Sequence, residues 1–144
     1  MKTILRLIET KGPGGAETVF INLFEAFDGG DFRSVALVAH GGWVHHALER
    51  AGVSAYTWNA KGSFNFGYLS KIVRVVRREQ VDLIEAHLSG ASLYASLAGM
   101  ITGTPVVSVF HGSVDLSASD RLIGTKVAII ASCISNAIAE SKKG

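Results

Sequence analysis

Residues 3–27 have the sequence TILRLIETKGPGGAETVFINLFEAF, and the order of its parts decides the fold. Residues 3–9 form an apolar run of strand length, and the glycine-rich turn GPGG at residues 12–15 interrupts it. Apolar side chains then recur at helical spacing through residues 16–27. They are Phe20, Leu23, Phe24 and Phe27. We therefore predict a strand, a tight glycine turn and a helix.

The same alternation of strand and helix patterns continues along the chain. Further strands are predicted at residues 34–40, 53–58, 81–87, 105–111 and 126–132. Further helices are predicted at residues 44–51, 66–79, 89–101, 117–123 and 135–142, and the helix at 89–101 is apolar enough to be buried. Strands that are apolar on both faces, each followed by a helix, are typical of a parallel sheet covered on both sides. Right-handed crossovers then predict an α/β fold with a doubly wound, mostly parallel, Rossmann-like sheet in the order 3-2-1-4-5-6.

The amino-acid composition excludes several classes of protein. The 144 residues correspond to about one domain, and 48% hydrophobic with 18% charged residues is enough for a folded core. Fourteen Lys+Arg against 12 Asp+Glu give a net charge of +2, which argues against a nucleic-acid partner. A single cysteine, Cys133, excludes an internal disulfide framework. No stretch has the pattern of a signal or a membrane span, so we expect a cytoplasmic location.

Candidate ligand-binding residues follow several of the predicted strands. In an open, doubly wound sheet, ligands bind outside the carboxyl ends of the strands. The glycine turn follows the first strand, and three of the five histidines, His40, His87 and His111, end later strands. We expect the glycine turn, His87 and His111 to lie closest together.

The glycine turn has two interpretations. Gly14 and Gly15 let the backbone approach a ligand closely, and the N–H groups that open the next helix favour an anionic phosphate. The alternative is an ordinary tight turn between a strand and a helix. A dinucleotide-binding motif would place glycine at residue 17, where Glu17 stands, and an acid instead of His40 at the end of the second strand.

His111 is the better catalytic candidate among the histidines. Gly112 follows it, so the chain can turn sharply and the imidazole can face a cleft. An imidazole near neutral pH suits a sugar hydroxyl or a developing charge. A partly buried histidine that bonds to a loop carbonyl remains the alternative for His111, and His87 has the same two interpretations.

Two other groups of polar residues have simpler explanations. We expect His40, His45 and His46 to form a cluster at the surface. The carboxylates nearby do not have the spacing of metal ligands, so we predict no metal site. Basic side chains on the helix at 66–79 form an ordinary solvated face, with contact to anionic lipid headgroups as the alternative. They are Lys71, Arg74, Arg77 and Arg78.

Several stretches together resemble one enzyme family. The sequence GPGGAE at residues 12–17 resembles the opening of the retaining family-four glycosyltransferases. VDLIEAH at residues 81–87 is similar to the fourth strand of that family, and PVVSVFHG at 105–112 is similar to the next strand with its terminal histidine. The resemblance covers essentially the whole chain.

The resemblance implies a fold and an activity. Such enzymes have the GT-B fold, in which two Rossmann-like domains face each other across a cleft. Residues 1–144 would be the N-terminal, acceptor-side domain, and the C-terminal donor-binding domain would be absent. The complete enzyme would transfer a sugar from a nucleotide-sugar donor to a glycan or lipid-linked acceptor with retention, in polysaccharide biosynthesis. A peripheral contact with the inner face of the membrane is part of this expectation.

The resemblance also assigns site residues. Gly14 and Gly15 would approach the donor diphosphate from across the cleft, and His111 would assist at the transferred sugar. The residues expected to support donor and substrate binding are Glu17, His87 and Gly112. No metal and no cofactor beyond the nucleotide-sugar co-substrate would be required, because helix N-termini and basic residues can stabilise the leaving diphosphate.

Two other functions remain open from the sequence. The chain could be a stand-alone binding or assembly module that needs a partner chain and self-associates through an exposed apolar patch. It could also be an unrelated Rossmann-type nucleotide-binding enzyme. If it is half of a transferase, we expect these 144 residues alone to be inactive, because the donor contacts would come from the other domain.

Overall fold

The computed structural model describes residues 1–27, 30–59 and 66–109, and strands alternate with helices throughout. The elements in chain order are β1 (Lys2–Ile8), α1 (Gly15–Ala26), β2 (Phe32–Ala39), α2 (Trp43–Arg50), β3 (Ala55–Trp58), α3 (Phe66–Arg78), β4 (Leu83–His87), α4 (Ser89–Thr102) and β5 (Val106–Val109). Each corresponds to an element that the sequence predicts. The strand and two helices predicted between residues 117 and 142 lie outside the described residues.

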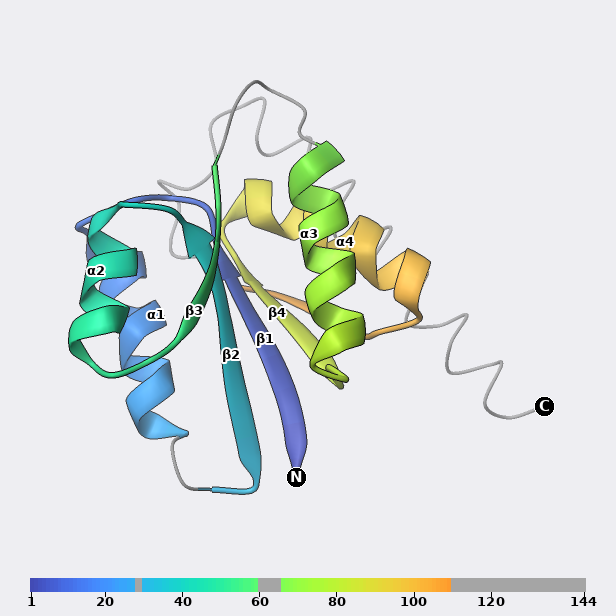
Figure 1. Ribbon diagram of the computed structural model, residues 1–144, viewed down its shortest axis with the longest axis horizontal. Helices are drawn as coiled ribbons and strands as arrows, with labels where there is room; N and C mark the ends of the chain where they lie inside the picture. Colours follow the sequence, from blue (N-terminus) through green and yellow to red (C-terminus); the bar gives the residue numbers. More distant parts are fainter. Residues whose placement is uncertain (28–29, 60–65, 110–144) are drawn as a thin grey trace.

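The strands form one parallel sheet in the order β3-β2-β1-β4-β5, which confirms the predicted order for these five strands. In the central strand, Leu5 lies opposite Val35 of β2 and Ile84 of β4. Helices α1 and α2 cover one face of the sheet, and α3 and α4 cover the other (Figure 1). The fold is therefore the predicted doubly wound, Rossmann-like sheet, and all strand carboxyl ends lie at one edge.

Each face of the sheet has its own apolar core, because successive side chains of a strand point to opposite faces. Leu5 and Leu7 of β1 face α3 and α4, where they pack with Ile72 and Ala95. Ile8 faces α1 and α2, where the core is built around Phe20 and Phe24. These two cores fix both layers of helices on the sheet.

Helix α4 is only partly buried, in contrast to the prediction of a helix buried all round. Ala91, Ala95 and Ala98 are fully buried against the sheet and α3. Met100 and Ile101 in the last turn are 55% and 54% exposed, because they lie off the stripe that the three alanines form. The helix ends at Gly103, whose φ of 73° is the left-handed conformation that glycine adopts readily.

Candidate functional site

The glycine turn after β1 leaves the N-terminus of α1 open. Gly14 is the N-cap, and no side chain caps the helix. The first N–H groups of a helix have no acceptor within the helix, so the first turn of α1 presents donors and a partial positive charge. A Cβ built on Gly15 would meet nothing within 4 Å. The backbone at this position is therefore accessible to a ligand.

Glu17 lies beneath this turn. A Cβ on Gly14 would come within 2.5 Å of Oε2 of Glu17, and one on Gly12 within 2.9 Å of its Cγ. Gly12 also has a φ of 65°, which L side chains rarely adopt. The side chain of Glu17 is thus packed under the turn, and glycine at residues 12 and 14 makes room for it.

The turn is joined to the loop that follows β2. The N–H of Val44 donates to the carbonyl oxygen of Lys11 at 3.2 Å. The stem of Lys11 packs on Gly42, where a Cβ would lie 2.9 Å from the Cβ of the lysine. The carboxyl ends of β1 and β2 therefore form one connected surface.

His87 ends β4 at the same edge, but its side chain turns into the protein. It is fully buried under α1, with its ring edge-on to Phe20 at 5.2 Å between centroids. Its Nε2 lies 2.7 Å from Oε1 of Glu85. The side chain of His87 therefore lies beneath α1, the helix that follows the glycine turn. His111 and Gly112 lie outside the described residues.

A buried ionic network continues from His87 across the sheet. Arg6 of β1 donates from Nη1 to Oε2 of Glu85 at 2.5 Å and from Nε to the hydroxyl of Ser34 at 3.2 Å. The guanidinium also lies 4.9 Å from the centroid of the Phe27 ring. Sequence analysis did not single out Arg6, although a charged residue inside an apolar strand was a signal for such a network.

The network keeps Glu85 ionised. Burial would raise the pKa of its carboxyl group, but the hydrogen bond with His87 and the charges of Arg6 and His87 together outweigh that effect. The pKa of Glu85 is therefore below its ordinary value, as expected for a carboxylate with two partners. This group stabilises the interior and is not open to a ligand.

Glu9, the residue after β1, is a carboxylate of a different kind. It is half-buried, and its carboxyl group lies against Gly90 in the first turn of α4, where a Cβ would sit 1.6 Å from Oε1. Burial raises the pKa of Glu9, and burial first, with the charge of Glu9 second, raises the pKa of Tyr68. Sequence analysis missed Glu9 as a site residue, because its packing against α4 depends on the tertiary fold.

The histidines that follow β2 form a surface cluster, as predicted. The N–H of Gly41 donates to Nδ1 of His45 at 3.0 Å, and Nε2 of His45 lies 3.4 Å from Glu49. The His40 and His46 rings lie 5.2 and 5.6 Å from that of His45. Over the described ranges, no group of three or more histidine, cysteine, aspartate or glutamate side chains is arranged to hold a metal ion.

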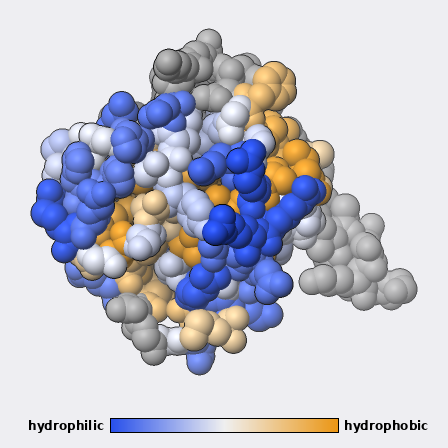
Figure 2. All heavy atoms as spheres, viewed as in Figure 1, coloured by the Kyte–Doolittle hydropathy of each residue, from blue (hydrophilic) through white to orange (hydrophobic). Residues whose placement is uncertain are grey.

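The basic face of α3 is solvated. Arg74, Arg77 and Arg78 are exposed, and Figure 2 shows a hydrophilic band where α3 lies at the surface. Lys71 is half-buried, with its ammonium group 5.8 Å from the centroid of the Tyr56 ring. Within the described part of the chain, no helix has the length and apolar character needed to cross a membrane.

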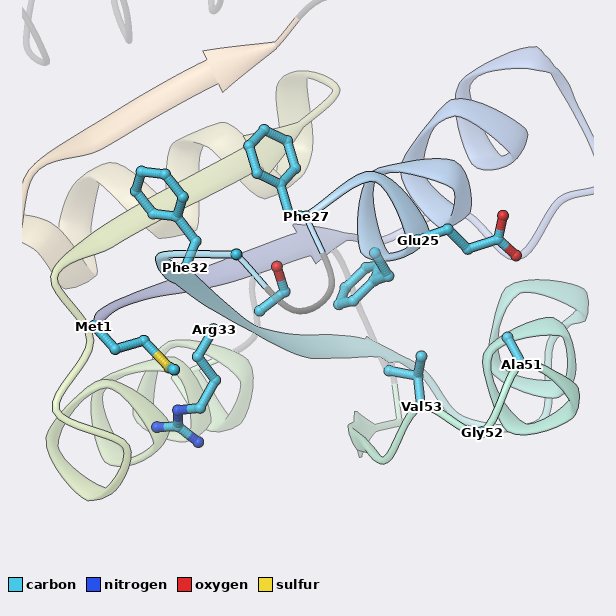
Figure 3. A pocket seen from close by; sticks show the side chains of 11 residues that line it. Met1, Glu25, Phe27, Phe32, Arg33, Ala51, Gly52 and Val53 are labelled. Carbon is cyan, nitrogen blue, oxygen red and sulfur yellow. The ribbon is translucent and has the colours of Figure 1, made fainter.

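A hollow of about 440 Å³ opens at the opposite, amino edge of the sheet (Figure 3). It lies between the end of α1, the start of β2 and the turn that leads into β3. The rings of Phe27 and Phe32 meet edge to face beside it, with centroids 5.9 Å apart. We place the candidate site at the carboxyl edge instead, because ligands of doubly wound sheets bind there.

The fold is similar to that of solved nucleotide-sugar enzymes. Anabaena Alr3699/HepE in complex with UDP-glucose has a TM-score of 0.72 at 21% identity, over 89% of this chain and 35% of that one. Acinetobacter baumannii MurG has a TM-score of 0.67 at 14% identity, over 91% and 40%. UDP-GlcNAc 2-epimerase from Neisseria meningitidis bound to UDP-GlcNAc has a TM-score of 0.58 at 17% identity, over 74% and 32%.

These similarities establish the fold, and the chain spans well under half the length of each of these structures. A glycosyltransferase from Rickettsia africae and the epimerase both share it, so the fold alone does not choose an activity. No curated protein matches the sequence. The family model described as Glycosyltransferase Family 4 matches residues 13–141, which include Gly14, Gly15 and almost all of the chain after them. The chain therefore belongs to glycosyltransferase family 4 and forms a Rossmann-like half of the GT-B architecture.

Proposed function

We propose that residues 1–144 are the N-terminal, acceptor-side domain of a retaining glycosyltransferase. The complete protein would transfer a sugar from a nucleotide-sugar donor to a glycan or lipid-linked acceptor. The observation that carries this proposal, together with family membership, is the uncapped N-terminus of α1 behind an unobstructed Gly15. HepE, which shares the fold, was crystallised with UDP-glucose, and this supports a uridine diphosphate sugar as the first donor to test.

In the proposed mechanism, the first turn of α1 stabilises the leaving diphosphate. Its N–H groups are fixed before the reaction, so they can stabilise the charge that develops on the phosphate oxygens without reorganising. Gly14 and Gly15 let that charge approach the backbone, while Glu17 holds the turn from beneath. His87 supports the same edge from under α1.

The remaining parts of the proposal rest on the family resemblance. His111, followed by Gly112, would lie near the transferred sugar and stabilise it in the transition state. A C-terminal domain would hold the donor across the cleft, and the isolated 144 residues would be inactive. The reaction would need no metal, and the complete protein would make a peripheral contact with the inner face of the membrane.

Replacing Gly15 tests the role of α1 directly. Gly15→Glu places a carboxylate at the helix N-terminus, where it stabilises the helix by about 0.3–1 kcal/mol but repels a diphosphate. We expect Gly15→Glu in the full-length protein to lower the affinity for UDP-glucose about tenfold or more, with the melting temperature unchanged or higher. Gly15→Ala is the matched control and should bind within a few-fold of the wild type, because open space surrounds that position. Equal binding by all three proteins would contradict the proposal.

The alternative of a stand-alone module has one supporting observation. Met100 and Ile101 at the end of α4, with Val107 of β5, expose between 48% and 55% of their surface. Such side chains favour docking of another domain or of a second copy. Light scattering of the 144-residue chain tests this, because a concentration-dependent dimer would support self-association and a monomer at all concentrations would argue against it.

A further inference from the structure

Glu9, the residue after β1, places a carboxyl group at the carboxyl edge of the sheet. It is half-buried, yet neither a hydrogen bond nor an ion pair joins its side chain to any residue in the described ranges. Transferring a charged group from water without a partner is unfavourable. Burial raises the pKa of the Glu9 carboxyl group for the same reason.

The surroundings of Glu9 are specific. Gly90 provides the space for its carboxyl group, because any larger residue there would put a Cβ 1.6 Å from Oε1. Tyr68 of α3 is fully buried nearby, and its ring stacks on Trp58 at 3.9 Å between centroids. Within the described ranges, no side chain of opposite charge pairs with the Glu9 carboxyl group at this edge.

The chemistry of this position disfavours an anionic ligand and favours a hydrogen-bond donor. The first turn of α1, six residues further along the chain, suits an anion, whereas a carboxylate at Glu9 repels one. A carboxylate accepts hydrogen bonds from hydroxyl groups, and these bonds are stronger than bonds between neutral groups. A sugar ring supplies such donors without a negative charge.

We infer that Glu9, held over Gly90 at the N-terminus of α4, accepts a hydrogen bond from a hydroxyl of the sugar acceptor and positions it at the carboxyl edge. The acceptor is therefore a neutral sugar at the contact point, even if it carries a lipid or phosphate elsewhere. This inference rests on the proposed transferase function and adds the residue that selects the acceptor.

The test uses the full-length protein and separates acceptor from donor. Wild type is first screened with a panel of nucleotide sugars and uncharged p-nitrophenyl glycosides, and the active pair is kept. We expect Glu9→Gln to raise the acceptor KM about tenfold, because a hydrogen bond to a charged carboxylate is replaced by a weaker one to a neutral amide oxygen. The donor KM should stay within twofold, and the melting temperature should not fall.

A second variant and a matched control keep the test decisive. Gly90→Ala inserts a methyl group where the Glu9 carboxyl lies, so it should raise the acceptor KM in the same way. Glu25→Gln removes the same charge from the end of α1 at the other edge of the sheet and should leave both KM values unchanged.

The outcomes distinguish this inference from the function on which it rests. An active wild type with an unchanged acceptor KM in Glu9→Gln would overturn the inference alone. A rise in donor KM instead would also overturn it, because Glu9 would then contact the donor sugar. No transfer by the wild type with any pair in the panel would count against the proposed function itself.

Discussion

Two carboxylates, one on β4 and one just after the neighbouring strand β1, show how the interior and the carboxyl edge differ. Glu85 of β4 binds both Arg6 and His87 under α1, and its pKa is held below the ordinary value. Glu9, just after β1, is half-buried without such partners in the described residues, and burial raises its pKa. The interior neutralises its charges within the fold, whereas the edge leaves one available to a ligand.

Breaking the interior network should have the largest effect on stability. Glu85→Leu leaves the Arg6 guanidinium buried without its counter-ion, which should lower the free energy of unfolding by about 3–5 kcal/mol. Urea unfolding measures this difference. The double variant Arg6→Met with Glu85→Leu should recover part of the loss, since the unpaired guanidinium is then removed. A loss below about 1 kcal/mol in the single variant would mean that the network is not stabilising.

Glu17 is a third carboxylate, and its side chain supports the backbone of the glycine turn at the carboxyl edge. Gly14→Ala places a Cβ 2.5 Å from Oε2 of Glu17, so the turn or the side chain must shift. We expect a loss of about 1–3 kcal/mol in the free energy of unfolding, as for other overpacked sites. Gly14 has a φ of 179°, so backbone strain does not contribute. Adding Glu17→Ala should relieve the clash, and the idea fails if the double variant is no more stable than Gly14→Ala.

Neutralising Glu9 should raise the free energy of unfolding, whereas the two changes above lower it. Glu9→Gln removes a desolvated charge that no residue in the described ranges balances, so we expect the free energy of unfolding to rise by about 0.5–2 kcal/mol at pH 7. Chemical unfolding with Glu25→Gln as the exposed control measures it. A clear loss of stability would show that Glu9 is a structural group like Glu85.

The effect of pH on the free energy of unfolding should differ between Glu9 and Glu85. Burial raises the pKa of Glu9 in the folded protein above the ordinary value of 4.5. Between these two pKa values the native state binds more protons than the unfolded state, so the protein loses stability as the pH rises. The pKa of Glu85 is lowered, so its contribution is present above its ordinary value and is lost as the pH falls through the folded pKa.

Unfolding curves between pH 4 and pH 7 can detect this difference. The stability gained by Glu9→Gln should be small near pH 4 and should grow as the pH rises. A gain that does not depend on pH would refute the raised pKa of Glu9.

Much of the fold could be predicted from the sequence, because it depends on local patterns. Apolar runs at strand length and helical spacing gave each described element, and right-handed crossovers gave the strand order. The burial of α4 was overestimated, since a uniformly apolar helix does not show which side meets the sheet.

The candidate site was less predictable, because its contacts join distant parts of the chain. The glycine turn between β1 and α1 was predicted from the sequence, and its role in binding a phosphate stays a prediction. The pairing of Arg6 with Glu85 and the position of Glu9 over Gly90 join residues about 80 positions apart, which no local pattern encodes. The roles of His111 and Gly112 stay predictions.

The most direct test of the account is hydrogen–deuterium exchange of the full-length protein with and without UDP-glucose. We expect protection of residues 12–18, which contain the glycine turn and the open first turn of α1, with no change in residues 24–34 beside the hollow at the amino edge. Protection confined to residues 24–34, or none in residues 12–18 at a saturating concentration, would contradict the assignment of the functional site to the carboxyl edge.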